Sequence, residues 1–139
     1  MQTEKMTRFG VSMPNRLLTH FDELISDKGY ANRSEALRDL VRDYLVEREW
    51  EADEETVGTV TIVYDHHVKE LADALTHIQH EMGTLIISSL HVHLTHTHCL
   101  EIIVVRGKSS EIRKMADHLI GTKGVIHGKL TAATIGSSF

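Results

Sequence analysis

Polar and apolar residues alternate over residues 8–13, which predicts a short β-strand with Phe9, Val11 and Met13 on one face. Two stretches with apolar residues at helical spacing follow, one after Pro14 and one after residues 32–34. Pro14 suits the first turn of a helix, and Lys28-Gly29 ends the first helical stretch. Residues 1–50 therefore predict the order β-α-α.

The pattern changes after an acidic stretch that ends at Glu55. The elements expected beyond it are a strand at 57–64, a helix at 66–82 capped by Asp65, strands at 85–94 and 99–106, a helix from Ser109 or Ser110 to near Gly121, and a strand at 125–132. This β-α-β-β-α-β order is that of a ferredoxin-like unit. We therefore expect an α+β chain with one domain over residues 1–55 and another over residues 56–139.

Composition limits the classes of function. Lys and Arg number 15 against 20 Asp and Glu, so the net charge of -5 disfavours a binder that attracts nucleic acid by overall positive charge. The single cysteine excludes an intrachain disulfide and fits a reducing compartment. No apolar run approaches the roughly 18 residues of a membrane helix, and the first residues lack the apolar stretch of a signal peptide. These features predict a cytoplasmic protein without a membrane segment.

A lone strand followed by two helices makes physical sense if two chains pair their strands antiparallel. Such a two-stranded ribbon fits the major groove of DNA, where Arg8, Gly10 and Ser12 would face the bases. Arg33 and Ser34 at the start of the second helix would contact a phosphate. With Gly29-Tyr30 and the Asn-Arg-Ser-Glu-Ala-Leu-Arg segment at 32–38, this half resembles the ribbon-helix-helix transcription factors. The alternative is that Arg8 and Ser12 are only the solvent face of an edge strand.

Ten of the 11 histidines lie beyond Asp65, and the densest segment runs from Leu90 to Glu101. Strand alternation places His91 and His93 on one face, and a tight return brings Cys99 alongside them. Two imidazoles and a thiolate suit a borderline-to-soft divalent ion better than Mg²⁺ or Ca²⁺. A fourth ligand from a second subunit would be His77 or His80. Spacing alone leaves square-planar Ni²⁺ or Cu²⁺ and tetrahedral Zn²⁺ open.

The His-x-His-x5-Cys-Leu-Glu segment, combined with the ribbon-helix-helix start, resembles the nickel-responsive transcriptional regulators of the NikR family. Further matching stretches are Tyr64-Asp65-His66, Ile78-Gln79-His80 and residues 124–128. The resemblance implies an ACT-like (ferredoxin-like) metal-binding domain and a homotetramer, a dimer of dimers. It also implies one Ni(II) per subunit, bound by His91, His93 and Cys99 of one subunit and by His80 of the opposing one.

The remaining candidates follow from the spacing or from the resemblance. Glu101 and Tyr64 are expected behind the ligands, where they would orient them. His77 is a less favoured ligand, and the resemblance implies that His66 binds other ions and that Glu35 and Asp39 hold a second cation such as K⁺ at the domain junction. The roles of four other histidines stay open, namely His67, His96, His98 and His118.

The expected function is metal-controlled binding of palindromic double-stranded operator DNA, with repression of nickel-uptake genes, by a protein that is not an enzyme. Two alternatives remain at this stage. A metal-dependent enzyme would use an open His-His-Cys site to activate water, with Glu101 as the only obvious base. A metal buffer or chaperone would need the metal site but no DNA.

Overall fold

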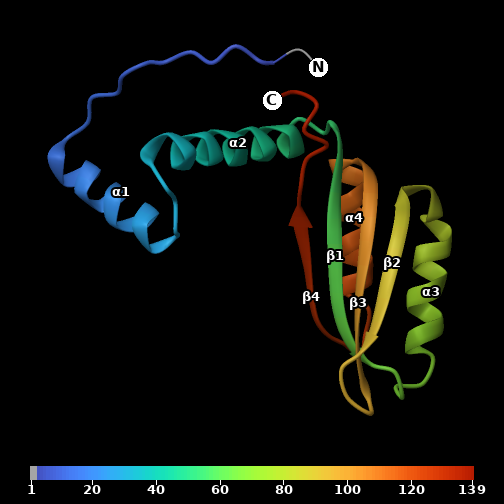
Figure 1. The fold of residues 1–139 in the computed structure, drawn as a ribbon. Helices are drawn as coiled ribbons and strands as arrows, with labels where there is room; N and C mark the ends of the chain where they lie inside the picture. Colours follow the sequence, from blue (N-terminus) through green and yellow to red (C-terminus); the bar gives the residue numbers. More distant parts are fainter. Residues whose placement is uncertain (1–2) are drawn as a thin grey trace. The chain divides into compact units, whose positions relative to one another are not determined.

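The computed structural model describes residues 3–139, which divide into two compact units between Val41 and Arg42 (Figure 1). The elements are α1 (Asn15–Asp27), α2 (Arg33–Glu51), β1 (Glu55–Asp65), α3 (Leu71–Glu81), a 3-10 helix η1 (Gly83–Leu85), β2 (Ile86–His93), β3 (His98–Lys108), α4 (Ser109–Ile120) and β4 (Val125–Ala132). Helix α2 is continuous, and its first residues belong to the amino-terminal unit while its last residues belong to the second unit. No helix in residues 3–139 has the length and apolar character needed to span a membrane.

The turn between α1 and α2 is built by a glycine and an asparagine. Gly29 takes a positive φ of 78°, and the amides of Gly29 and Tyr30 donate to the carbonyls of Ser26 and Ile25. This pair of bonds satisfies carbonyls that the end of α1 would otherwise leave without partners. The Oδ1 atom of Asn32 then accepts from the amide of Glu35 at 2.9 Å, which caps α2.

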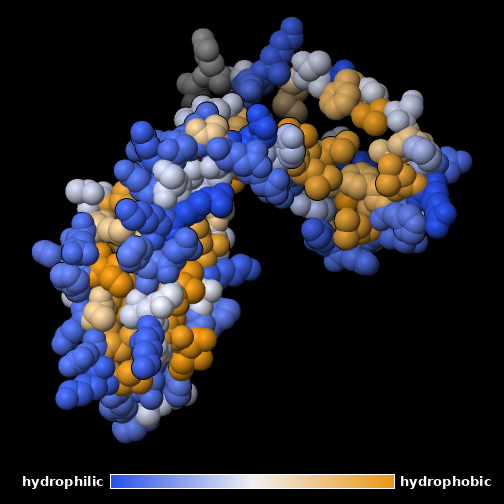
Figure 2. Space-filling view, turned by 180° about the vertical axis from the view of Figure 1, so that it is seen from behind, coloured by the Kyte–Doolittle hydropathy of each residue, from blue (hydrophilic) through white to orange (hydrophobic). Residues whose placement is uncertain are grey.

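Residues 3–14 have no regular secondary structure, so the strand predicted at 8–13 does not form within the single chain. A strand needs a neighbour to satisfy its amides and carbonyls, and a lone strand has none. Phe9 is 80% exposed and Val11 is 58% exposed. Figure 2 shows further apolar surface on this unit, and Leu17 and Leu24 of α1 are also more than half exposed.

The second unit is a four-stranded antiparallel sheet in the order β2-β3-β1-β4. Burial alternates along β1 and β3, so one face of the sheet is packed and the other is partly exposed. The two helices cover the packed face (Figure 1). The core between helices and sheet contains Val60, Ile62, Leu71, Leu75, Ile103, Val105, Ile112, Met115, Ala116 and Leu119. This arrangement confirms the mixed α/β fold and the β-α-β-β-α-β order.

The pairing of β2 with β3 contains one irregularity. Ile86 pairs with Val105, and the next pair is Ser88 with Val104, so Ile87 is an extra residue at this point. Such a β-bulge inserts one residue into one strand of an antiparallel pair. Beyond it the pairing is regular as far as His93 opposite Cys99.

The helix predicted at 66–82 begins later than expected, at Leu71. Asp65 does not cap it: its carboxylate accepts from the amide of His67 at 2.8 Å, which holds the chain in a turn. Glu70 then takes a positive φ of 69° directly before the helix. The prediction therefore mistook a local Asp turn for a helix cap, because both use the same side chain.

Candidate metal centre

Cys99 lies near the start of β3, buried, on the face of the sheet that the helices cover. The strand register places Tyr64 of β1 opposite it on one side and His93 of β2 opposite it on the other. Residues directly opposite each other project to the same face. The thiol of Cys99, the imidazole of His93 and the phenol of Tyr64 therefore lie together at one end of the packed face.

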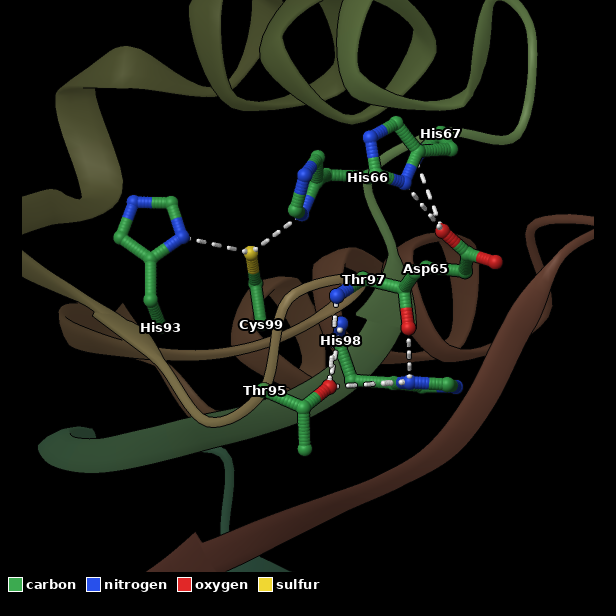
Figure 3. Close-up of polar contacts among 8 residues, drawn as sticks. All are labelled: Asp65, His66, His67, His93, Thr95, Thr97, His98 and Cys99. Atoms are coloured by element: carbon green, nitrogen blue, oxygen red, sulfur yellow. Dashed lines mark hydrogen bonds and ion pairs between the residues drawn. The ribbon is translucent and has the colours of Figure 1, made fainter.

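Two imidazoles contact the thiol (Figure 3). The sulfur of Cys99 is 3.1 Å from Nδ1 of His66 and 3.5 Å from Nδ1 of His93. His66 directly follows β1, and its amide donates to the carbonyl of Thr97, which extends the β1–β3 pairing beyond the strand end. Within residues 3–139, these three side chains are the only His/Cys/Asp/Glu group able to hold a metal ion, with donor atoms all within 4.8 Å of one another.

The donor spacing fits a transition metal. With bonds of about 2.3 Å to sulfur and 2.0 Å to nitrogen, two ligands lie about 3.0 Å apart at a right angle and about 3.5 Å apart at a tetrahedral angle. The two measured distances to the Cys99 sulfur, 3.1 and 3.5 Å, match these values. A thiolate with imidazoles also suits nickel, copper or zinc and does not suit calcium or magnesium.

His91, the other predicted strand ligand, lies beside this group. Its ring centroid is 5.1 Å from that of His93 and 6.1 Å from that of Tyr64. In β2 it pairs with Glu101, which places it on the same face as Cys99. The structure therefore brings three of the predicted residues to one face but puts His66, and not His91, in contact with the sulfur.

The buried carboxylate of Glu101 lies on the same sheet face as Cys99, opposite His91. It accepts from the side-chain amide of Gln79 at 3.1 Å and from the hydroxyl of Tyr64 at 3.4 Å. Burial, with the nearby Glu101 and Cys99, raises the pKa of Tyr64 to about 12. Tyr64 thus stays a neutral hydrogen-bond donor to Glu101.

The outer side of the cluster is rich in imidazole. The ring centroids of His66 and His67 are 4.2 Å apart, and His67 in turn lies 3.7 Å from the carboxylate of Asp65 (Figure 3). Desolvation and the neighbouring rings of His67 and His93 lower the pKa of His66 below its usual value. The neutral form that can coordinate a metal is therefore favoured at His66.

Residues 57–133 match the model of the NikR C-terminal nickel-binding domain. The chain belongs to the NikR family. Over 93% of its length it is 62% identical to a putative nickel-responsive regulator of Geobacter sulfurreducens, of which the match covers 94%. It is 57% identical over 95% of its length to one of Solibacter usitatus, covering 96% of that chain, and 48% identical over 96% to one of Methanothrix thermoacetophila, covering 97%. These relatives are named as regulators, in agreement with the prediction that the chain is not an enzyme.

A solved structure of an uncharacterized protein from Thermotoga maritima is also similar, with a TM-score of 0.53 at 15% sequence identity. The match covers 58% of this chain and all of that one. At this level of identity the likeness concerns the fold alone.

The helix histidines predicted for the NikR-type site lie on α3, and both are exposed. His77 forms an ion pair with Glu81 at 3.2 Å, in the last turn of the helix. Within residues 3–139, the side chain of His80 makes no hydrogen bond, ion pair or ring contact. A single chain therefore does not join His80 to Cys99.

The residues predicted to contact DNA are all exposed, and three of them, Arg8, Gly10 and Ser12, lie on the irregular segment before α1. Arg33 already has a partner, because its Nε and Nη2 atoms donate to the two carboxylate oxygens of Asp22 at 2.8 Å. Ser34 is exposed beside it. Of the two residues expected to hold a second cation, Asp39 accepts from the hydroxyl of Tyr30 at 2.7 Å, and the amide of Glu35 is used by the α2 cap.

Proposed function

We propose that this chain is a nickel-dependent transcriptional repressor that binds Ni(II), one per subunit, through His91, His93 and Cys99 together with His80 of the partner subunit. The observation that carries this proposal is the buried Cys99 sulfur, at ligand spacing from imidazole nitrogen, inside the segment that matches the nickel-binding domain. The exposure of His80 supports this arrangement, because its side chain is accessible to a metal ion held by a second chain. In this proposal His66 is an alternative ligand for metal ions whose preferred coordination geometry differs from that of Ni(II).

The donor set requires protons to leave before nickel binds. Cys99 must be a thiolate and the imidazoles must be neutral, so nickel affinity falls as the pH drops. Glu101, held by Gln79 and Tyr64, lies opposite His91 in the sheet and orients its ring. This supporting set keeps the ligand face ordered in the absence of metal.

The amino-terminal unit supplies the DNA-binding part. Two chains pair their residues 8–13 as an antiparallel ribbon, which covers Phe9 and Val11 and turns Arg8, Gly10 and Ser12 to the major groove. The high exposure of Phe9 and Val11 in the single chain supports this pairing, because apolar side chains of this size tend to be covered. Arg33 and Ser34 contact the phosphates next to the groove.

Assembly as a dimer of dimers follows from the two kinds of contact. Ribbon pairing joins two amino-terminal units, and a metal site shared between subunits joins the second units. Nickel binding then favours the arrangement that places two ribbons on two half-sites of a palindromic operator. In this proposal residues 1–55 are the DNA-binding domain, residues 56–139 are the metal-binding and tetramerisation domain, and Glu35 and Asp39 hold K⁺.

An electrophoretic mobility shift assay with nickel titration tests this function. The probe is a palindromic duplex selected from a random library by the nickel-loaded protein. We expect a shift with stoichiometric Ni(II) that is lost when a chelator is added or when Cys99 is replaced by Ser. Nickel binding without any nickel-dependent shift would replace the repressor proposal with that of a metal buffer.

A further inference from the structure

The end of helix α2 is fixed in the second unit through the only tryptophan of the chain. Trp50 is 4% exposed, and its indole nitrogen donates to the carbonyl of Ala133 at 3.0 Å. The same carbonyl accepts from the hydroxyl of Thr56 at 2.9 Å. The ring lies directly over Gly58, where a Cβ atom would come within 3.2 Å of it. One side chain therefore ties α2 to β1 and to the segment after β4.

The first residues of α4 hold the same helix end by its backbone. The hydroxyl of Ser109 donates to the carbonyl of Trp50 at 2.6 Å, and the amide of Ser109 donates to the carbonyl of Glu54. The carboxylate of Asp53 accepts from the amide of Ser110 at 2.8 Å, which caps α4. Asp53 has a positive φ of 56°, a conformation that Asp adopts more readily than most residues other than glycine. From this position, just after α2, its carboxylate reaches the first turn of α4.

Helix α4 also reaches the side of the unit that carries the candidate ligands. It packs against α3, β1, β3 and β4. Ile112 and Met115 of α4 are fully buried in the same core as Leu75 of α3, the helix that carries His80. A displacement of α3 in this core would also displace α4, because protein interiors are close-packed and have low compressibility.

We propose that these contacts form a coupling joint, defined as Trp50, Asp53, Ser109 and Ala133, through which the state of the metal site is transmitted to helix α2. Ser109 and Asp53 are its positioning residues, since they connect α4 to the helix end and lie outside the proposed metal and DNA sites. Helix α2 is continuous from Arg33 to Glu51, so it begins in the amino-terminal unit and its last turn belongs to the joint. This inference rests on the proposed function for its purpose but is measurable without DNA.

Amide hydrogen exchange of the full-length protein, with and without Ni(II), tests the joint. The variant is Ser109→Ala, which removes the hydroxyl that donates to Trp50 and keeps a small buried side chain. The matched control is Thr122→Ala, because Thr122 also donates a hydroxyl to a carbonyl of α4, that of His118 at 2.7 Å, but at the far end of the helix. Asp53→Asn serves as a conservative variant, since Asn keeps an oxygen acceptor and tolerates a positive φ.

In the unchanged protein we expect nickel to slow exchange of the amides of α3 and of residues 46–51 by about tenfold or more. In Ser109→Ala the slowing at residues 46–51 is lost while that in α3 persists, and Thr122→Ala and Asp53→Asn behave like the parent. The joint is disproved if nickel slows α3 and leaves residues 46–51 unchanged in the parent, or if Ser109→Ala keeps the full effect. A failed mobility shift with the parent protein would instead refute the repressor function and leave the exchange result intact.

Discussion

The Nδ1 atom of His66 lies 3.1 Å from the sulfur of Cys99, closer than the 3.5 Å that separates this sulfur from Nδ1 of His93. The residue that touches the thiol most closely is thus one that the sequence ranked below the two strand histidines. Its position follows from the β1–β3 register, in which Asp65 pairs with His98 and the pairing continues for one more residue. His66, His91, His93 and Cys99 all come from three adjacent strands or their ends.

Replacing each candidate donor by alanine tests whether His66 binds nickel together with His93 and Cys99. We expect His93→Ala and Cys99→Ala to weaken nickel binding by on the order of 100-fold or more, since each removes a proposed metal ligand. His66→Ala should keep one nickel per subunit and the absorption bands of the parent, and His67→Ala controls for the loss of a nearby exposed ring. An isothermal titration with nickel gives the affinities. An equal loss in His66→Ala and His93→Ala would make His66 a nickel ligand.

A shared site predicts complementation between two inactive variants. His80→Ala and Cys99→Ala should each fail to form the nickel site, because each lacks one donor of every site. When the two are unfolded together and refolded, mixed assemblies regain sites that combine His80 of one chain with the His91, His93 and Cys99 of the other. Nickel absorption after mixing measures this recovery. If only His77→Ala with Cys99→Ala recovers, the helix ligand is His77.

The buried phenol predicts a pH dependence with a defined sign. The pKa of Tyr64 is raised from 10.0 to about 12, so the fold favours its neutral form. Its contribution to stability is fully present below pH 10 and is lost as the pH rises towards 12. Glu101→Gln removes a negative charge and should lower this pKa, although burial still keeps it above 10. The measurement is a pH titration of the phenolate absorbance of the three tyrosines, in which Tyr64→Phe identifies the tyrosine that ionises at the highest pH. An unchanged titration midpoint of Tyr64 in Glu101→Gln would rule out this charge effect.

In the proposed complex with DNA, the Arg33–Asp22 pair makes DNA binding sensitive to the charge of Asp22. Both side chains are more than 40% exposed, so their ion pair is weak and a phosphate can displace it. Arg33→Ala should weaken binding to the selected duplex and reduce the slope of affinity against salt by about one, and Asp22→Asn should strengthen binding.

Arg106→Ala is the matched control, because Arg106 is another surface arginine paired with a carboxylate, that of Glu55 at 3.1 Å. It should leave both the affinity and the salt slope unchanged. If Arg33→Ala and Arg106→Ala gave the same slope, Arg33 would not contact a phosphate.

Regular burial patterns made most of the second unit predictable from sequence. Residues 125–132 were predicted as a strand with the bounds that β4 has, and the predicted strand at 57–64 lies within β1. Alternation along these segments reflects a sheet with one packed face, which is the strongest pattern that a sequence carries. The position of Glu101 on the same sheet face as Cys99 followed from the same spacing of two.

Contacts that depend on long-range pairing or on a second chain could not be read in this way. His66 reaches Cys99 because two strands happen to pair in one register, which no local pattern specifies. The predicted strand at 8–13 is not formed in a single chain, and His80 stays apart from Cys99 for the same reason: the expected partner of each lies on another copy. The start of α3 was missed because Asp65 caps a turn instead of a helix.

The bulge at Ile87 decides which face of the sheet carries the metal chemistry. In a strand of uniform alternation, Ile86 would share its face with Leu90 and Val92, and the histidines at 91 and 93 would point away from the helices. The extra residue reverses the alternation, so that Ile86 packs against the core while His91 and His93 project to the same side as Cys99. If Ile87 were paired as an ordinary strand residue, with Ile86 kept in the core, Leu90 and Val92 would take the places of the two imidazoles beside the thiol. Deleting Ile87 would instead give a regular strand that keeps both Ile86 opposite Val105 and His93 opposite Cys99.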